Sequence, residues 1–436
     1  MIHIIQSIIL SNVFVEYFTK HSNAIYNEAL TLIFSIIVVN FLVERYLDYL
    51  NNKRIDEELP GEVKDVYDAE RYKKSQRYKK VNDKFSSITS SFSFMLVIFM
   101  LFFQVFGVVD NYAREFSDNA VFIALIFFGI LMFASDIINT PFGIYDTFVI
   151  EEKFGFNKTT IRTFIFDKLK SWLLGGLIGG GALALIIWLY QVFGYYFWIS
   201  AWIAITLFMV FVTMFYSTLI VPLFNKQTPL EDGELRNAIQ RFCQKVGFKL
   251  TNVYVIDGSK RSTKANAYFS GLGSKKRIVL YDTLIEDLTT DEIVAVLAHE
   301  IGHYKHKHSL WSILIGILQS GFTLYLFSLF TVNDVLLSKA MGATEPGIHM
   351  VLMAFGVIYS PISTVIGLFM NYISRKNEYQ ADRFVLKHFD KEQLISSLKK
   401  LSSNNLSNLT PHPAFVFFHY SHPTLIQRIR ALREAD

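Results

Sequence analysis

The sequence is short of charge and almost without cysteine, and both shortages narrow the class of protein. Asp, Glu, Lys and Arg make up 18% of the 436 residues, whereas an average soluble domain has about 25%. The single cysteine, Cys243, excludes an internal disulfide framework and a cysteine-rich zinc module. The net charge of +4 is too small to indicate binding to nucleic acid.

Hydrophobic residues are abundant instead. They make up 52% of the chain, and 41 residues are Phe. This apolar content excludes a disordered chain, and it exceeds what one water-soluble core of this size can bury. We therefore predict an α-helical multi-pass membrane protein.

Long uncharged runs predict seven membrane-spanning helices, because a helix of about 20 apolar residues crosses the hydrocarbon layer. The run 171–225 contains no charged residue and is long enough for two spans that turn near 191–196. The first span is the least regular, because Glu44 and Arg45 interrupt it. The other predicted spans are 29–50, 85–109, 119–135, 309–333 and 347–374.

Lysine and arginine are distributed unevenly between the two sides of these spans. All but three of the 42 Lys and Arg residues lie on one side, the exceptions being Lys20, Arg114 and Lys339. Because cytoplasmic segments carry the excess of positive charge, we predict that this side faces the cytosol. The segments concerned are 44–84, 136–170, 226–308 and 375–436.

The N-terminal run Ile2–Phe18 is apolar but short, and it contains Glu16. It has neither a basic n-region nor a small-residue cleavage site. We interpret it as an interfacial or partial helix rather than a signal peptide.

Five glycines between residues 175 and 181 crowd one predicted span and include two G-x-x-x-G spacings. Small residues allow helices to approach closely in lipid, so the spacing favours close helix packing. The alternative is a wall thinned to leave a lumen.

The spans divide the chain into four regions. Residues 1–225 form an N-terminal transmembrane region of about five spans, and 309–374 form spans six and seven. Between them, 226–308 is predicted to be a cytosolic catalytic loop with a β-ribbon and a metal-binding helix. Residues 375–436 are predicted to complete the site from the cytosolic side. The two cytosolic regions would form a small α+β zinc-peptidase domain.

The strongest motif is His299-Glu300-Ile301-Gly302-His303. On a helix, residues four apart share one face, so His299 and His303 can bind a single ion. Glu300 then lies beside the metal, where it can accept a proton from bound water. The acidic residues Asp291 and Glu292 indicate where this helix begins.

A catalytic zinc usually has three protein ligands. His306 lies about 10 Å along the helix from His299, which is too far for a shared ion. His308 could reach back only if the chain left the helix, so we interpret His306 and His308 as solvated residues at the membrane edge. Glu378 is the better third ligand, because spans six and seven return it to the membrane surface that carries His303. Asp382, four residues further on, would hold the free N–H of a ligand imidazole.

Substrate-binding groups are also predicted. Val253–Ile256 and Arg277–Tyr281 have the composition of β-strands, and residues 265–269 between them resemble an edge strand. An extended peptide could pair with such an edge, and Asn266 could add a hydrogen bond. A histidine near the zinc could stabilise the oxyanion, and His422 is one candidate beside His412 and His419. From spacing alone, Arg428 and Arg430 are more typical of surface charges than of site residues.

Together these residues resemble the type I CaaX prenyl proteases, integral-membrane zinc metallopeptidases associated with the maturation of farnesylated proteins. The resemblance extends from about residue 30 to residue 433. Beyond the zinc motif it rests on 148–159, 221–226, 258–261, 266–269 and 277–284.

The resemblance implies one Zn²⁺ per chain, bound by His299, His303 and Glu378, with Glu300 as the base. It also implies that His422 and Arg428 line the site and that Asn266 contacts the substrate backbone. The seven spans would enclose a large chamber with the zinc at its cytosolic end. The partners would be a peptide or prenylated protein substrate and membrane lipid, in the endoplasmic reticulum of a eukaryote or the cytoplasmic membrane of a bacterium.

Two other functions remain open from the sequence. A quality-control protease that degrades damaged membrane proteins could use the same site without a CaaX preference. A seven-helix transporter or receptor with structural zinc is the third possibility. Against it, the ionisable residues gather at the cytosolic ends of the spans rather than at mid-membrane.

Overall fold

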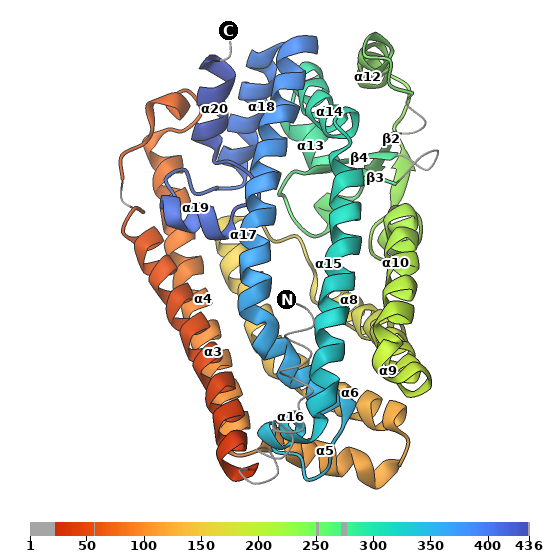
Figure 1. Ribbon diagram of the computed structural model, residues 1–436. Coiled ribbons are helices and arrows are strands. Elements are labelled where there is room, and N and C mark those ends of the chain that lie inside the picture. Colours follow the sequence, from red (N-terminus) through yellow and green to blue (C-terminus); the bar gives the residue numbers. More distant parts are fainter. Residues whose placement is uncertain (1–21, 56, 250–252, 272–276, 435–436) are drawn as a thin grey trace.

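The computed structural model describes residues 22–55, 57–249, 253–271 and 277–434, and the predicted interfacial helix at 2–18 lies outside them. In these residues, six helical segments are long and apolar enough to cross a membrane. Most of them run side by side along the length of the molecule (Figure 1). The segments are Glu28–Asn52, Ala69–Phe102, Ala120–Phe154, Ile161–Phe224, His308–Ala340 and Ile348–His388.

The segment Ile161–Phe224 has 64 residues and folds back on itself. The chain reverses at η4, where Gly194 has a φ of 52° that favours glycine. The helices on either side, α9 and α10, pack against each other, which confirms the predicted turn (Figure 1). The parts are α8 (Ile161–Leu174), η3 (Gly175–Gly179), α9 (Gly180–Phe193), η4 (Gly194–Tyr196), α10 (Phe197–Phe215), η5 (Tyr216–Ile220) and α11 (Val221–Phe224).

The glycines of this segment do not serve close packing. A Cβ added at Gly175, Gly176, Gly179 or Gly181 would meet nothing within 4 Å. Only Gly180 has a neighbour at that range, a Leu125 methyl group at 3.6 Å. The prediction of a tight helix interface is therefore wrong, and η3 is a π-helical turn with open space around it.

The helices of the second and third predicted spans have other bounds than the uncharged runs. α4 (Ala69–Phe102) stops before Gln104, whose φ of 52° breaks the helix, and α5 (Val105–Phe116) begins again in a new direction. The uncharged run continues through this break, so hydropathy could not locate it. α6 (Ala120–Tyr145) runs past Asp136, whose carboxylate pairs with Lys168 at 2.7 Å.

A four-stranded sheet lies at one end of the helices, near α13 and α14 (Figure 1). Its order is β1-β2-β4-β3, with β2 and β4 parallel and the other two pairs antiparallel. The predicted strands at 253–256 and 277–281 are present, and β3 is an edge strand as expected. The strands are β1 (Gln227–Pro229), β2 (Val253–Ile256), β3 (Ala267–Ser270) and β4 (Arg277–Tyr281).

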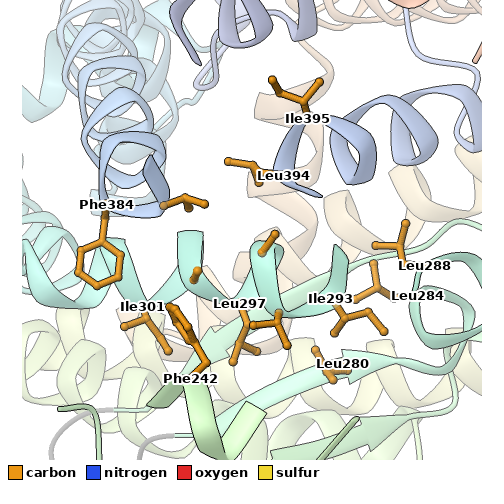
Figure 2. Packing of buried hydrophobic residues seen from close by; sticks show 14 of the residues in the cluster. Phe242, Leu280, Leu284, Leu288, Ile293, Leu297, Ile301, Phe384, Leu394 and Ile395 are labelled. Carbon is orange, nitrogen blue, oxygen red and sulfur yellow. The ribbon is translucent and has the colours of Figure 1, made fainter. Parts of the chain in front are cut away.

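The main core at this end surrounds α14 (Thr290–Lys305). Ile293, Leu297 and Ile301 project from its buried side toward β4 and α12, and Leu394 approaches from α18 (Figure 2). Each such fully buried side chain contributes about 1.5–3 kcal/mol. This core holds α14 between the sheet and the C-terminal helices.

The remaining helices complete the frame. Short helices connect the long ones, and α17 alone spans 41 residues, from one end of the molecule to the other (Figure 1). Their bounds are α3 (Ser22–Asn52), η1 (Gly61–Val63), η2 (Asp146–Glu151), α7 (Glu152–Phe154), α12 (Glu234–Lys245), η6 (Gly258–Lys260), α13 (Asp282–Asp287), α15 (His308–Phe330), η8 (Thr331–Asn333), α16 (Asp334–Ala340), α17 (Ile348–His388), α18 (Lys391–Asn404), α19 (Pro413–His419) and α20 (Leu425–Glu434).

Candidate active site

Helix α14 begins with a capping box. The Thr289 hydroxyl accepts from the backbone N–H of Glu292, and the Glu292 carboxylate accepts from the N–H of Thr289. Glu292 is buried and also accepts from Ser396 and Lys400 on α18. Burial alone would raise the pKa of Glu292, but the contacts with Lys400, Ser396 and Thr289 lower it overall. The ionised Glu292 carboxylate therefore attaches the first turn of α14 to α18.

Replacing Thr289 by alanine should loosen this start. The loss of an N-cap hydroxyl costs about 1 kcal/mol, so backbone amides in the first turn of α14 should exchange with solvent about 5-fold faster. Hydrogen–deuterium exchange of the full chain in detergent measures the effect. Thr290→Ala makes the same change one residue later and should leave the rate unchanged. Equal rates in both variants would contradict the capping role.

Three side chains meet at the end of α14. His299 and His303 lie one turn apart on α14, and Glu378 comes from α17. The His299 Nε2 lies 3.1 Å from His303 Nε2 and 3.3 Å from Glu378 Oε2, and His303 Nε2 lies 3.1 Å from Glu378 Oε1. The structure thus brings together the three ligands predicted from the sequence.

The glycine inside the motif allows the two helices to meet. A Cβ at Gly302 would lie 3.0 Å from the Cα of Ala381 and 3.0 Å from the Cβ of Phe384, closer than ordinary packing permits. α14 and α17 are in close contact here. Gly302 therefore sets the approach that carries Glu378 to the two histidines.

The donor set fits a metal ion. Ligands bound at about 2.0–2.1 Å around a tetrahedral zinc lie about 3.3 Å apart, which matches the separations of these three groups. Glu378 Oε2 is buried and makes no hydrogen bond within the described residues, although His299 Nε2 lies 3.3 Å and Arg428 Nη1 3.6 Å away. A buried carboxylate oxygen left without a donor is costly unless a cation compensates it. His299, His303 and Glu378 are thus suited to bind zinc.

Behind His299 lies a buried ion pair. Its Nδ1 is 2.9 Å from Asp382 Oδ1, and Arg428 binds the same carboxylate through Nε at 2.9 Å and Nη2 at 2.6 Å. Burial and the Arg428 cation lower the pKa of His299, but Asp382 and Glu378 outweigh them and raise it to about 9. The site therefore attracts positive charge strongly, and a metal ion can take the place of that proton.

The other predicted residues line one cavity of about 650 Å³ with the ligands. Glu300 and Arg428 belong to its wall, as does the exposed Asn266 just before β3. His422 is 63% exposed, yet its Nε2 lies 3.3 Å from Glu378 Oε1. His412 and His419, the alternatives to His422, are absent from the cavity wall.

His308 is not the solvated residue that the sequence predicted. His306 is exposed, but His308 is only 6% exposed and contacts His303. The chain leaves the helix at Lys307, whose φ of 58° turns α15 so that its first residue points back. No signal near His308 marked this turn, because lysine carries no preference for a left-handed backbone.

The fold and the site together define a multi-pass integral membrane protein that is a zinc metalloendopeptidase. Residues 48–226 match a family model described as "CAAX prenyl protease N-terminal, five membrane helices", and residues 229–436 match "Peptidase family M48". The chain therefore belongs to the family of the type I CaaX prenyl proteases, as the sequence motifs predicted.

Individual relatives match almost end to end. CAAX prenyl protease 1 of Saccharomyces cerevisiae is 35% identical, over 91% of this chain and 93% of its own length. Homologues in Oryza sativa and Homo sapiens are 35% and 30% identical, covering 93% and 86% of this chain and 98% and 88% of their own lengths. The crystal structure of Saccharomyces mikatae Ste24p is 34% identical with a TM-score of 0.86, covering 93% of this chain and 98% of that one.

Proposed function

We propose that this enzyme hydrolyses peptide bonds at the C-termini of prenylated CaaX proteins. One combined observation carries the proposal. The ligand triad and Glu300 line the same cavity as the segment leading into the free edge strand β3. This arrangement occurs in a chain that is 35% identical, over 91% of its length, to a protein named CAAX prenyl protease 1.

The proposed topology has seven spans around a chamber, with the segment Ile161–Phe224 contributing two of them. Residues 226–308 and 375–436 would lie in the cytosol and form the α+β catalytic domain, because they hold most of the positive charge. The membrane would be the endoplasmic reticulum in a eukaryote or the cytoplasmic membrane in a bacterium.

In the proposed mechanism, His299, His303 and Glu378 would hold one zinc ion. When bound, zinc lowers the pKa of a water molecule to about 7 and polarises a carbonyl group. Glu300 accepts the proton of the attacking water and returns it to the leaving amine. His422 lies on the open side of the cavity, where its ring N–H can donate to the oxyanion.

Substrate would bind as an added strand. The outer edge of β3 pairs with no strand of the described chain, so its backbone groups can pair with an extended peptide. Asn266 Oδ1 accepts from the N–H of Ala267, which leaves its amide N–H₂ free to donate to a peptide carbonyl. Arg428 gives its Nε and Nη2 donors to Asp382, and its Nη1 lies 3.6 Å from Glu378 Oε2, so its contribution to substrate binding would come through the positive charge it places beside the ligands.

The test compares a farnesylated CaaX peptide with its unprenylated twin, using purified protein in detergent and Glu300→Gln as the blank. Faster cleavage of the farnesylated peptide is the expected result. Equal cleavage of both would retain the zinc mechanism and favour a general membrane protease with a quality-control role. Cleavage of neither, with zinc bound, would contradict the proposed substrate class.

A further inference from the structure

The far nitrogen of each ligand histidine has a different partner. His299 presents its Nδ1 to the carboxylate of Asp382. His303 presents its Nδ1 to another imidazole, the Nδ1 of His308, at 3.0 Å. The His308 Nε2 in turn lies 2.8 Å from Oε1 of Gln380 on α17. Gln380, His308 and His303 thus form a line of buried or half-buried side chains, and His303 at its end is a proposed zinc ligand.

With a neutral His308, this line allows only one arrangement of protons. The amide oxygen of Gln380 can only accept a hydrogen bond, so His308 must donate through Nε2. A neutral His308 then has a lone pair at Nδ1, which accepts from the Nδ1–H of His303. With its proton on Nδ1, His303 has the lone pair on Nε2 directed at His299 and Glu378. This is the tautomer that binds a metal.

We propose that His308 and Gln380 are positioning residues that hold His303 in its metal-binding tautomer and orientation. The proposal rests on the proposed zinc site but not on the identity of the substrate. Gln380 lies two residues after Glu378 on the same helix, so α17 supplies one ligand directly and orients a second through His308. The left-handed turn at Lys307 places His308 within reach of His303, because it directs His308 back toward α14.

The chain offers a matched pair of variants. His308→Phe retains an aromatic ring and removes both nitrogens, and we expect it to raise the zinc dissociation constant about 10- to 100-fold. His306→Phe makes the same change at the exposed ring stacked 5.5 Å from His308, and zinc binding should stay unchanged. Competition with a chelator measures zinc affinity in the full-length protein, and the visible spectrum of Co²⁺-substituted protein reports the ligand geometry. Wild-type affinity and an unaltered Co²⁺ spectrum in His308→Phe would overturn the proposal.

Variants of Gln380 test whether His308 donates its hydrogen bond to this residue, even if His308→Phe fails to fold. Gln380→Glu can still only accept, so zinc affinity should equal or exceed that of the wild type. Gln380→Leu removes the acceptor and should weaken zinc binding. Equal weakening by both variants would overturn the proposal. Because zinc binding is measured without peptide, this failure is distinct from a failure to cleave CaaX substrates.

Discussion

Glu300→Gln should lower the rate constant for peptide cleavage by about 10²–10⁴-fold, because general-base catalysis contributes that much. Glutamine has nearly the shape of glutamate but cannot accept the proton of the attacking water. Zinc content should stay at the wild-type level, since Glu300 is not one of the three grouped ligands. Cleavage kinetics and elemental analysis of the same preparation measure both quantities.

The control for this variant is Glu286→Gln, an exposed glutamate on the neighbouring helix α13. It makes the same chemical change outside the cavity and should cleave at the wild-type rate. A Glu300→Gln enzyme that cleaves as fast as this control would contradict the assigned base. Loss of zinc from Glu300→Gln would instead show that Glu300 supports the metal.

Arg428→Met should have the largest effect on stability. The Arg428 guanidinium is buried with the carboxylates of Asp382 and Glu378, so removing it leaves both buried carboxylates without this cation. Breaking a buried ion pair in this way costs about 3–5 kcal/mol. The fall in the thermal unfolding midpoint, measured on zinc-free protein, reports the loss.

Arg430→Met is the matched control, two residues further along α20. Arg430 is 61% exposed and pairs with Glu62 at the surface, so its loss should cost less than about 1 kcal/mol. The double variant Arg428→Met with Asp382→Asn removes the nearer of the two orphaned charges and should recover part of the stability. No recovery in the double variant would show that Arg428 stabilises the fold by another contact.

The meeting of His299, His303 and Glu378 could be predicted because its signals are local. The spacing of His299 and His303 is contained within two turns of one helix, and the two spans between His303 and Glu378 return the chain to the same surface. Helix geometry and span count were enough to bring three distant residues together. The edge position of β3 followed in the same way from its composition and flanking turns.

The features that the sequence did not predict depend on contacts between distant segments, which leave no local pattern in the sequence. The break at Gln104 lies inside an uncharged run, and the glycine of that run, Gly107, stands three residues later within the next helix, so it does not mark the break. The turn at Lys307 that buries His308 is set by how α15 packs after α14. The pairing of Arg428 with Asp382 joins residues 46 positions apart, so spacing alone could not select Arg428 over Arg430.

Because α17 is long, a small bend in its membrane-spanning part would move the Glu378 carboxylate a large distance. Pro361, which lacks a backbone N–H, is the natural bending point of this helix, and Glu378 lies about 25 Å beyond it. A bend of about 3° would displace the carboxylate by more than 1 Å, whereas metal–ligand distances tolerate about 0.2 Å. Any motion that admits substrate and spares the ligands must therefore occur in helices that hold none, such as α8 and α9, which are joined by η3, whose glycines border open space.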